Sequence, residues 1–295
     1  MTYVVMVLLG ATLYGTMSSF VKLSYSRGYN AAEISFTQAA LAALFLGICA
    51  FVTRKNNKER LTRKVLFSLL FTGSLIGLTN FLYYQSVNYS SASLSIVILM
   101  QFTWFSLLLE WLIFKKRPSP VELLTVVLIL VGTVIAGNIF SAEKYSFSLK
   151  GMVLALLSSL TYAAYIVANG RIGGGGRWQS KSTFIMMGSA CTIFLINSKT
   201  IMTGNHFDSD FLLWAMFFAV VGTTIPTALF AASIPKVGAG VSAILMTVEL
   251  PVAILCAGLV LHERVSPLQV AGIIIMLAAI STMHYYKSLK SEKQS

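Results

Sequence analysis

The chain has 295 residues, of which 56% are hydrophobic and only 11% are charged. Soluble globular domains carry about 25% charged residues, so this composition excludes an ordinary soluble protein. The formal net charge of +12 comes from basic residues in short segments between apolar stretches, and this pattern argues against a nucleic-acid-binding protein.

The apolar stretches set the predicted fold. Each is about 20 residues long, the length that a helix needs to cross a hydrocarbon core of about 30 Å. A membrane span must satisfy its backbone hydrogen bonds internally, so each stretch is predicted to be a helix. The predicted spans are 3–24, 31–53, 64–87, 92–113, 121–140, 150–169, 183–203, 212–234, 239–261 and 267–286. The first stretch is too long for a cleaved signal peptide and has no basic region before it, so we expect it to be a span.

The basic residues between the spans predict the orientation. With the N-terminus inside, sixteen Lys and Arg residues fall in cytoplasmic segments and six fall on the other side. Cytoplasmic loops of membrane proteins carry the excess of Lys and Arg. We therefore expect a multi-pass protein of the cytoplasmic (inner) membrane with both termini in the cytoplasm.

The two halves of the chain resemble each other. Shifted by 147 residues, the run Arg117–Pro120 aligns with Arg264–Pro267, and with one further residue of shift Tyr14 aligns with Tyr162. An odd number of helices in each half makes the second copy enter the membrane from the opposite side, as in the inverted repeats of secondary transporters. The predicted organisation is a first five-helix repeat at 1–145, a second five-helix repeat at 146–288 and a cytoplasmic tail at 289–295.

Particular residues carry a resemblance to a known family. The second half has a Glu-x-Pro step, an acidic turn and a Gln-x-x-Gly step, and the first span has a Tyr-Gly step. These residues are Glu249, Pro251, Glu263, Gln269, Gly272, Tyr14 and Gly15. On the basis of these residues, the chain from about 3 to 286 resembles the EamA-type ten-helix permeases of the drug/metabolite transporter superfamily. The first half departs from the pattern, because Lys116 replaces the acidic turn residue and Trp104 replaces the proline.

The resemblance implies a transporter and not an enzyme. Members of the family are exporters and some importers of metabolites, so export is the expected direction. The family architecture implies a central cavity lined by the first, third, fourth, sixth, eighth and ninth spans.

Glu249 is the main candidate for a functional residue. It lies about halfway along the ninth predicted span, where a carboxylate costs at least about 2.5 kcal/mol on insertion scales. No Asp, Lys, Arg or other Glu is predicted at its depth. Glu249 is therefore interpreted either as a site for a substrate ammonium group or a proton, or as a protonated packing residue.

Aromatic and amide side chains are dense near the predicted depth of Glu249. An aromatic cavity with one carboxylate suits a cationic or zwitterionic organic solute through cation–π contacts. The predicted substrate-binding residues are Glu249, Trp104, Gln101, Tyr14, Tyr84, Tyr162, Tyr165 and Asn169, and the predicted helix-breaking residues are Pro226 and Pro251. Packing against other helices is the alternative role for each ring and each proline.

The sequence predicts no metal site and no cofactor. Cys49, Cys191 and Cys256 are isolated within apolar stretches, without the spacing of a zinc site or a disulfide framework. The expected partners are a small-molecule substrate and the lipid bilayer, and the protein is expected to be a monomer or a homodimer, with proton coupling open. A membrane-embedded enzyme would need paired acids, a metal cluster or a nucleophile–base pair, and none is found.

The functional hypothesis is a secondary transporter that works by alternating access. The expected solute is an amino acid, an amine or an aromatic metabolite. A multidrug or lipophilic-cation exporter is the alternative.

The predicted orientation can be tested by labelling single cysteines in a background free of the three native ones. Because Ser209 is expected outside and Ser180 inside, an impermeant maleimide added to intact cells should label Ser209→Cys and leave Ser180→Cys unlabelled. The reverse pattern would overturn the orientation.

Overall fold

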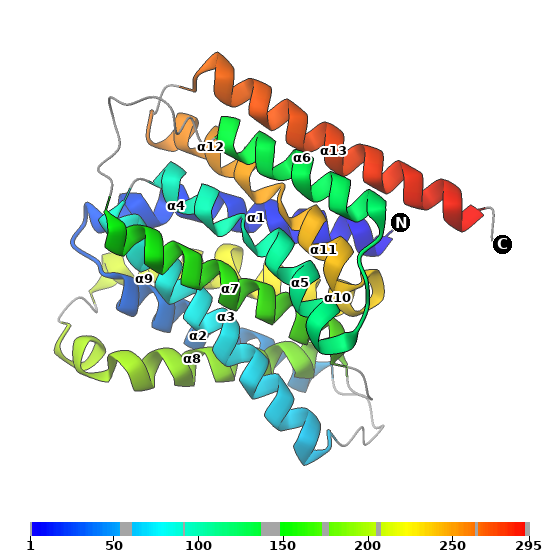
Figure 1. Cartoon of the computed structure of the whole chain (residues 1–295). Helices are drawn as coiled ribbons and strands as arrows, with labels where there is room; N and C mark the ends of the chain where they lie inside the picture. The colour runs from blue at the N-terminus through cyan, green and yellow to red at the C-terminus, as the bar shows by residue number, and fades with distance from the viewer. Residues whose placement is uncertain are drawn as a thin grey trace.

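The computed structural model describes residues 2–53, 61–90, 92–136, 148–172, 177–204, 208–262 and 265–292. Within these ranges every regular element is a helix and there is no strand (Figure 1). The helices are α1 (Thr2–Tyr25), α2 (Ala31–Val52), α3 (Arg63–Tyr89), α4 (Ala92–Leu99), α5 (Phe102–Phe114), α6 (Pro120–Ala136), α7 (Leu149–Arg171), α8 (Trp178–Thr203), α9 (Ser209–Ala219), the π-helical turn η1 (Val220–Thr224), α10 (Ile225–Val237), α11 (Ala239–Met246), α12 (Glu249–Val260) and α13 (Pro267–Glu292).

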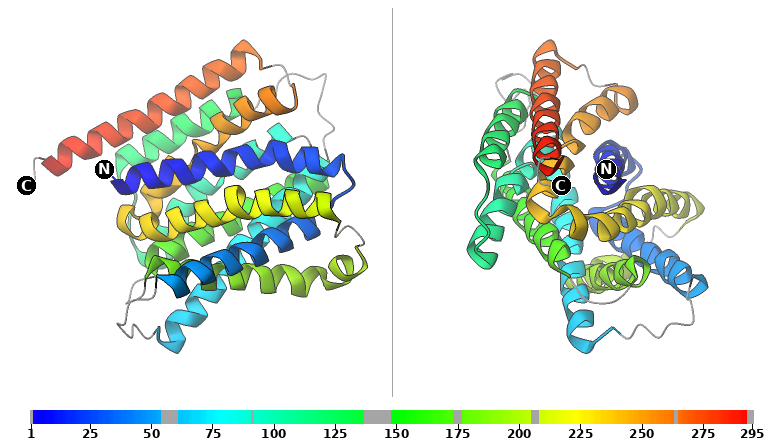
Figure 2. Two further views of the ribbon diagram at one scale, coloured as in Figure 1. Left: turned by 180° about the vertical axis from the view of Figure 1, so that it is seen from behind. Right: turned by 90° about the vertical axis from the view of Figure 1, so that its right-hand side faces the viewer.

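The helices form a bundle with the dimensions of a membrane domain. Among the described residues, eight helical segments are long and apolar enough to cross a membrane, and Pro120–Ala136 and Pro267–Met283 are shorter apolar helices. Large apolar side chains such as Leu124, Leu195 and Leu259 are exposed, which hydrocarbon tolerates and water does not. The start of α1 and the end of α13 lie on the same side of the bundle, which we call the N-side (Figure 2).

The helix ends differ from the predicted spans at several places. The seventh span was predicted to begin at 183, but α8 begins at Trp178, so Ser180 lies half-buried in its first turn and not in a loop. The apolar pattern missed this turn because its inward-facing side chains, Gln179 and Ser182, are polar. Residues 137–140 of the fifth predicted span, and Glu263 and Arg264, lie outside the described residues.

Two spans are broken at matching positions. The fourth span divides into α4 and α5 at Gln101, and the ninth divides into α11 and α12 at Val248. Both residues have φ −59° and ψ −17°, and each donates its N–H three residues back, to Ile98 (3.1 Å) and Leu245 (3.3 Å) respectively. Each break is therefore a short 3₁₀-like step, which often marks a hinge or a functional site.

Prolines do not explain both breaks. Pro251 lies in the first turn of α12, where its missing N–H is readily tolerated. Trp104 occupies the corresponding turn of α5, and that span breaks in the same way. Pro226 follows η1, in which the Ile225 N–H reaches five residues back to Val220, so a π-bulge interrupts the eighth span just before this proline.

Further features recur 147 residues apart. Lys115 and His262 both have a left-handed backbone, φ 56° and 53°, just beyond the ends of α5 and α12. Ser119 forms a reciprocal cap with Glu122 at the start of α6, and Ser266 does so with Gln269 at the start of α13. The residues that follow each broken span thus adopt the same local structure in both halves.

Helix packing follows the same two-fold pattern. α2 packs on α8 and α6 packs on α13, each pairing one half with the equivalent helix of the other. α3 packs on α7 as α10 packs on α1. This interleaving places α1, α7 and the two broken spans in the centre of the bundle (Figures 1 and 2).

Glycines allow α3 and α8 to approach closely. A Cβ atom on Gly73 would collide with the carbonyl oxygen of Ile185, and one on Gly188 would collide with that of Leu70. The Gly73–Gly77 step thus serves helix contact, a common use of small residues in membrane proteins.

Gly73→Ala should lower the thermal stability of the detergent-solubilised protein. Overpacking of this kind costs about 1–3 kcal/mol when the obstacle is backbone. Gly47→Ala is the matched control, because its Cβ would lie an ordinary 3.5 Å from the Thr183 methyl group on the same helix α8. Equal melting temperatures for the two variants would contradict the close packing.

Candidate functional site

A small cavity lies where the central helices meet the break in the ninth span. Its lining comes from α1, α3, α4, α7 and α12 and consists of Tyr14, Met17, Thr79, Asn80, Tyr83, Tyr84, Ile96, Leu99, Tyr162 and Glu249. Its open space is about 20 Å³, enough for one water molecule. A metabolite can therefore enter only if the surrounding helices separate.

Glu249 is the one acidic side chain in this lining. It is 3% exposed and is the first residue of α12, just after the break. The positive end of a helix dipole favours an anion at that position. The Tyr162 hydroxyl donates a hydrogen bond of 2.6 Å to Oε1 of Glu249. The carboxylate therefore has two sources of support within the membrane.

Gly15 brings α1 against this carboxylate-bearing turn. A Cβ at position 15 would come 2.6 Å from the Glu249 carbonyl oxygen and 3.0 Å from Cβ of Val252. The absence of a side chain lets the helices meet there, and the preceding residue, Tyr14, lines the cavity. The Tyr-Gly step thus positions one helix at the site.

Aromatic rings surround the Tyr162 side chain. Its ring centroid lies 4.7 Å from that of Phe102, 6.4 Å from that of Tyr14 and 6.2 Å from that of Tyr165. Tyr14 also stacks on Phe230 at 5.6 Å. The carboxylate therefore lies at the edge of an aromatic cluster, which can present π faces to a cation.

The structure brings four of the predicted binding residues to the cavity: Tyr14, Tyr84, Tyr162 and Glu249. Tyr165 and Asn169 form the next layer on α7, where Asn169 Nδ2 donates to the Tyr165 hydroxyl over 3.3 Å. They are buried but are not part of the cavity lining.

Gln101 and Trp104 lie at the break in the fourth span. Trp104 Nε1 donates to Gln101 Oε1 over 2.8 Å, and the indole stacks on Phe105 with centroids 3.9 Å apart. Both side chains are half-buried and outside the cavity lining. The two prolines, Pro226 and Pro251, also lie outside this lining, beside the π-bulge and in the first turn of α12.

Sequence reasoning missed several lining residues on α3, notably Thr79 and Asn80. Asn80 is 7% exposed, and its helical spacing from Gly73, Gly77 and Tyr84 places all four on one face. An amide in the middle of an apolar span, on the same face as two packing glycines, was the signal available.

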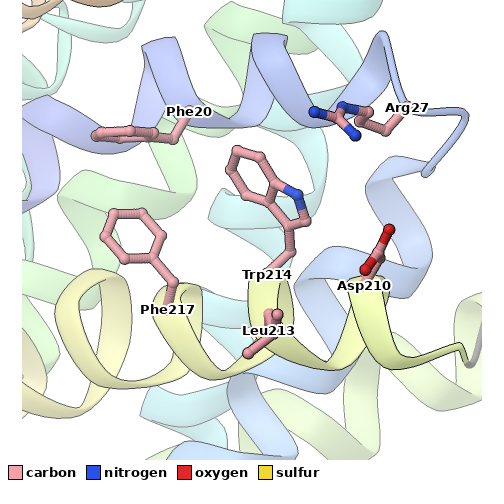
Figure 3. Close-up of a pocket in the computed structure, with 6 residues that line it drawn as sticks. All are labelled: Phe20, Arg27, Asp210, Leu213, Trp214 and Phe217. Carbon is pink, nitrogen blue, oxygen red and sulfur yellow. The ribbon is translucent and has the colours of Figure 1, made fainter.

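A second, more open space lies between α1 and α9 on the side opposite the N-side (Figure 3). This groove of about 400 Å³ is lined by Phe20, Arg27, Asp210, Leu213, Trp214 and Phe217. Arg27 and Asp210 face each other across its mouth, and the Trp214 ring lies between the two helices. Phe20 and Phe217 meet edge to face at 4.8 Å and close its inner end.

An all-helical bundle with broken spans, and with a buried carboxylate at one of the breaks, is typical of membrane transporters. The comparisons agree: the model of the EamA-like transporter family matches residues 1–137 and 149–284. The chain belongs to this family of ten-helix membrane proteins.

Two relatives agree with the assignment, and one solved structure agrees with the fold. The uncharacterized transporter YcbK of Bacillus subtilis is 24% identical over 296 residues, covering 98% of this chain and 95% of the relative. The uncharacterized transporter sll1319 of Synechocystis is 24% identical over 236 residues, covering 78% of this chain and 70% of the relative. One crystal structure shares the fold at a TM-score of 0.71 and 14% identity, covering 94% of this chain and 95% of that one.

A double-mutant cycle tests the contact between Tyr162 and Glu249. Tyr162→Phe removes the hydroxyl that donates to the carboxylate, and a lost bond to a charged group costs about 1.5–3 kcal/mol. In a Glu249→Gln background the same change should cost less, because a neutral acceptor forms a weaker bond.

The unfolding free energies of the wild type, the two single variants and the double variant are measured in the same detergent. Together they give the coupling energy between the two side chains. Tyr165→Phe is the matched control, since its hydroxyl contacts Asn169 and not Glu249. Strictly additive changes would show that the two side chains do not interact.

Proposed function

We propose that the protein is a secondary transporter that moves a small organic metabolite bearing an amino group, such as an amino acid, an amine or an aromatic metabolite. The observation that carries this proposal is the buried Glu249 carboxylate, hydrogen-bonded to Tyr162 at the edge of an aromatic cluster. A carboxylate at membrane depth is a marker of solute or proton pathways.

The chemistry of the cavity lining favours a positively charged group. One carboxylate and four tyrosines contribute a negative charge and π faces, and Thr79 and Asn80 add neutral polar groups. The lining contains no Lys or Arg among the described residues, so it offers no positive charge to a phosphate. A sugar-phosphate carrier is therefore disfavoured.

Alternating access accounts for the closed cavity. With space for a single water, the site can load only when one set of helices moves from another. The 3₁₀-like steps at Gln101 and Val248 are places where the half-helices can pivot. One such step lies in each of the two proposed five-helix repeats, 1–145 and 146–288.

The proposed setting is the cytoplasmic membrane, with the N-side facing the cytoplasm and export as the direction of transport. Arg171, Arg177, Lys181 and Lys236 lie at the N-side, in keeping with the predicted orientation. A proton bound at Glu249 could be exchanged for the solute cation, which would couple export to proton entry.

The lipophilic-cation exporter is the second candidate. The groove between α1 and α9 favours it, because Phe20, Trp214 and Phe217 offer three aromatic rings near the opposite membrane surface. A bulky quaternary amine could occupy such a groove without fitting the central cavity.

Glu249→Gln should weaken the affinity for amine-bearing solutes while leaving the protein folded. Transport is measured in proteoliposomes over amino acids, polyamines and quaternary amines, with and without a pH gradient. We expect about a tenfold or greater loss for amines, the scale of a lost desolvated ion pair. If the unchanged protein transports only quaternary amines, the lipophilic-cation exporter is the better assignment.

Glu122→Gln is the matched control, since this carboxylate caps the start of α6 through Ser119 and lies outside the cavity. It should transport like the unchanged protein. Wild-type rates, selectivity and pH profile in Glu249→Gln would make Glu249 a packing residue.

A further inference from the structure

Glu110 is another buried carboxylate, and the sequence reading did not single it out. It lies one turn before the end of α5, on the N-side, and is 4% exposed. Its Oε1 lies 3.3 Å from Nη2 of Arg171 at the end of α7 and 3.4 Å from Nζ of Lys116. Its Oε2 accepts a hydrogen bond of 3.1 Å from the Gly240 N–H at the start of α11.

These contacts join three spans at one point. α5 belongs to the fourth span, α7 is the sixth and α11 begins the ninth. Both broken spans are therefore tied to each other and to α7 through one side chain. The carboxylate also lies at the N-terminus of α11, where the helix dipole adds to the attraction of the two cations.

The aligned positions at the other end of the bundle do not repeat these residues. The residue 147 positions after Glu110 is Ala257, and on the alignment of Tyr14 with Tyr162 the residue that corresponds to Arg171 is Leu23. On that side the bundle instead has the open groove between α1 and α9.

We infer that Glu110 is a positioning residue that holds the N-side gate of the transport pathway closed, through Arg171, Lys116 and the start of α11. This inference rests on the proposed function, because a gate has a role only in a protein that alternates its access. Opening the pathway to the N-side requires the three spans to separate, and Glu110 must then release its partners. The Glu110 contacts therefore stabilise the state in which the N-side is closed.

Accessibility of two buried reporter positions tests the gate. Ser106 lies one turn before Glu110 on α5 and is 0% exposed. Ala253, 147 residues later on α12, is 4% exposed and reports on the opposite side. Each is changed to cysteine in a background free of Cys49, Cys191 and Cys256, and the rate of reaction with a water-soluble maleimide is measured.

Glu110→Gln should raise the labelling rate at Ser106→Cys by about fivefold or more, the low end of conformational coupling effects, and lower it at Ala253→Cys. Arg171→Gln should act in the same direction, and it serves as the test if Glu110→Gln does not fold. Glu122→Gln, also a carboxylate at the N-side, should leave both rates unchanged.

Faster labelling at both positions would mean that Glu110 only stabilises the fold, and unchanged rates would mean that it holds no gate. Either result overturns the inference. The assay needs no solute, so it is independent of the substrate assignment. If labelling shifts as expected but proteoliposomes carry no amine, the proposed substrate is wrong and the gate stands.

Discussion

The arrangement of this protein depends on how it keeps one carboxylate inside a membrane. Glu249 lies about halfway along the ninth span, and a carboxylate at the centre of a bilayer costs at least about 2.5 kcal/mol, so the surrounding structure has to offset that cost. The break in the ninth span makes Glu249 the first residue of α12, at the favourable end of its dipole. Tyr162 donates to it at 2.6 Å, and Gly15 lets α1 close over the same turn. Helix break, hydrogen bond and close packing therefore serve one site.

The two halves share a frame and differ where chemistry is needed. The breaks, the left-handed residues and the helix caps recur 147 residues apart, yet Phe102 occupies the position that corresponds to Glu249. Both contact Tyr162, one as a ring and one as an acceptor. Near the ends of the two broken spans the difference is reversed, because the first half has Glu110 on the N-side and the second has Ala257 at the opposite end. The two halves thus repeat the same backbone features with different chemistry at the sites that matter.

Much of the fold could be predicted from the sequence, because the length of each apolar stretch and the charged residues between stretches can be read directly along the chain. The number of spans and the membership of the EamA-like family were confirmed. Side-chain direction could not be predicted, since it depends on how each helix is rotated and where it breaks. The 3₁₀-like step at Gln101 leaves Trp104 paired with that amide beyond the cavity lining, whereas Asn80 enters the lining unpredicted. Glu110 was missed because two of its partners, Arg171 and Gly240, come from distant segments.

Carbodiimide modification of Glu249 tests the central claim most directly. Dicyclohexylcarbodiimide enters membranes and reacts with buried carboxyl groups, and mass spectrometry of the peptide that contains Glu249 measures the extent of reaction. If the carboxylate binds the amino group of the solute, transported amines should protect Glu249, and analogues with the amino group replaced by hydroxyl should not. Equal modification with and without an amine that the protein is actively transporting would contradict the account.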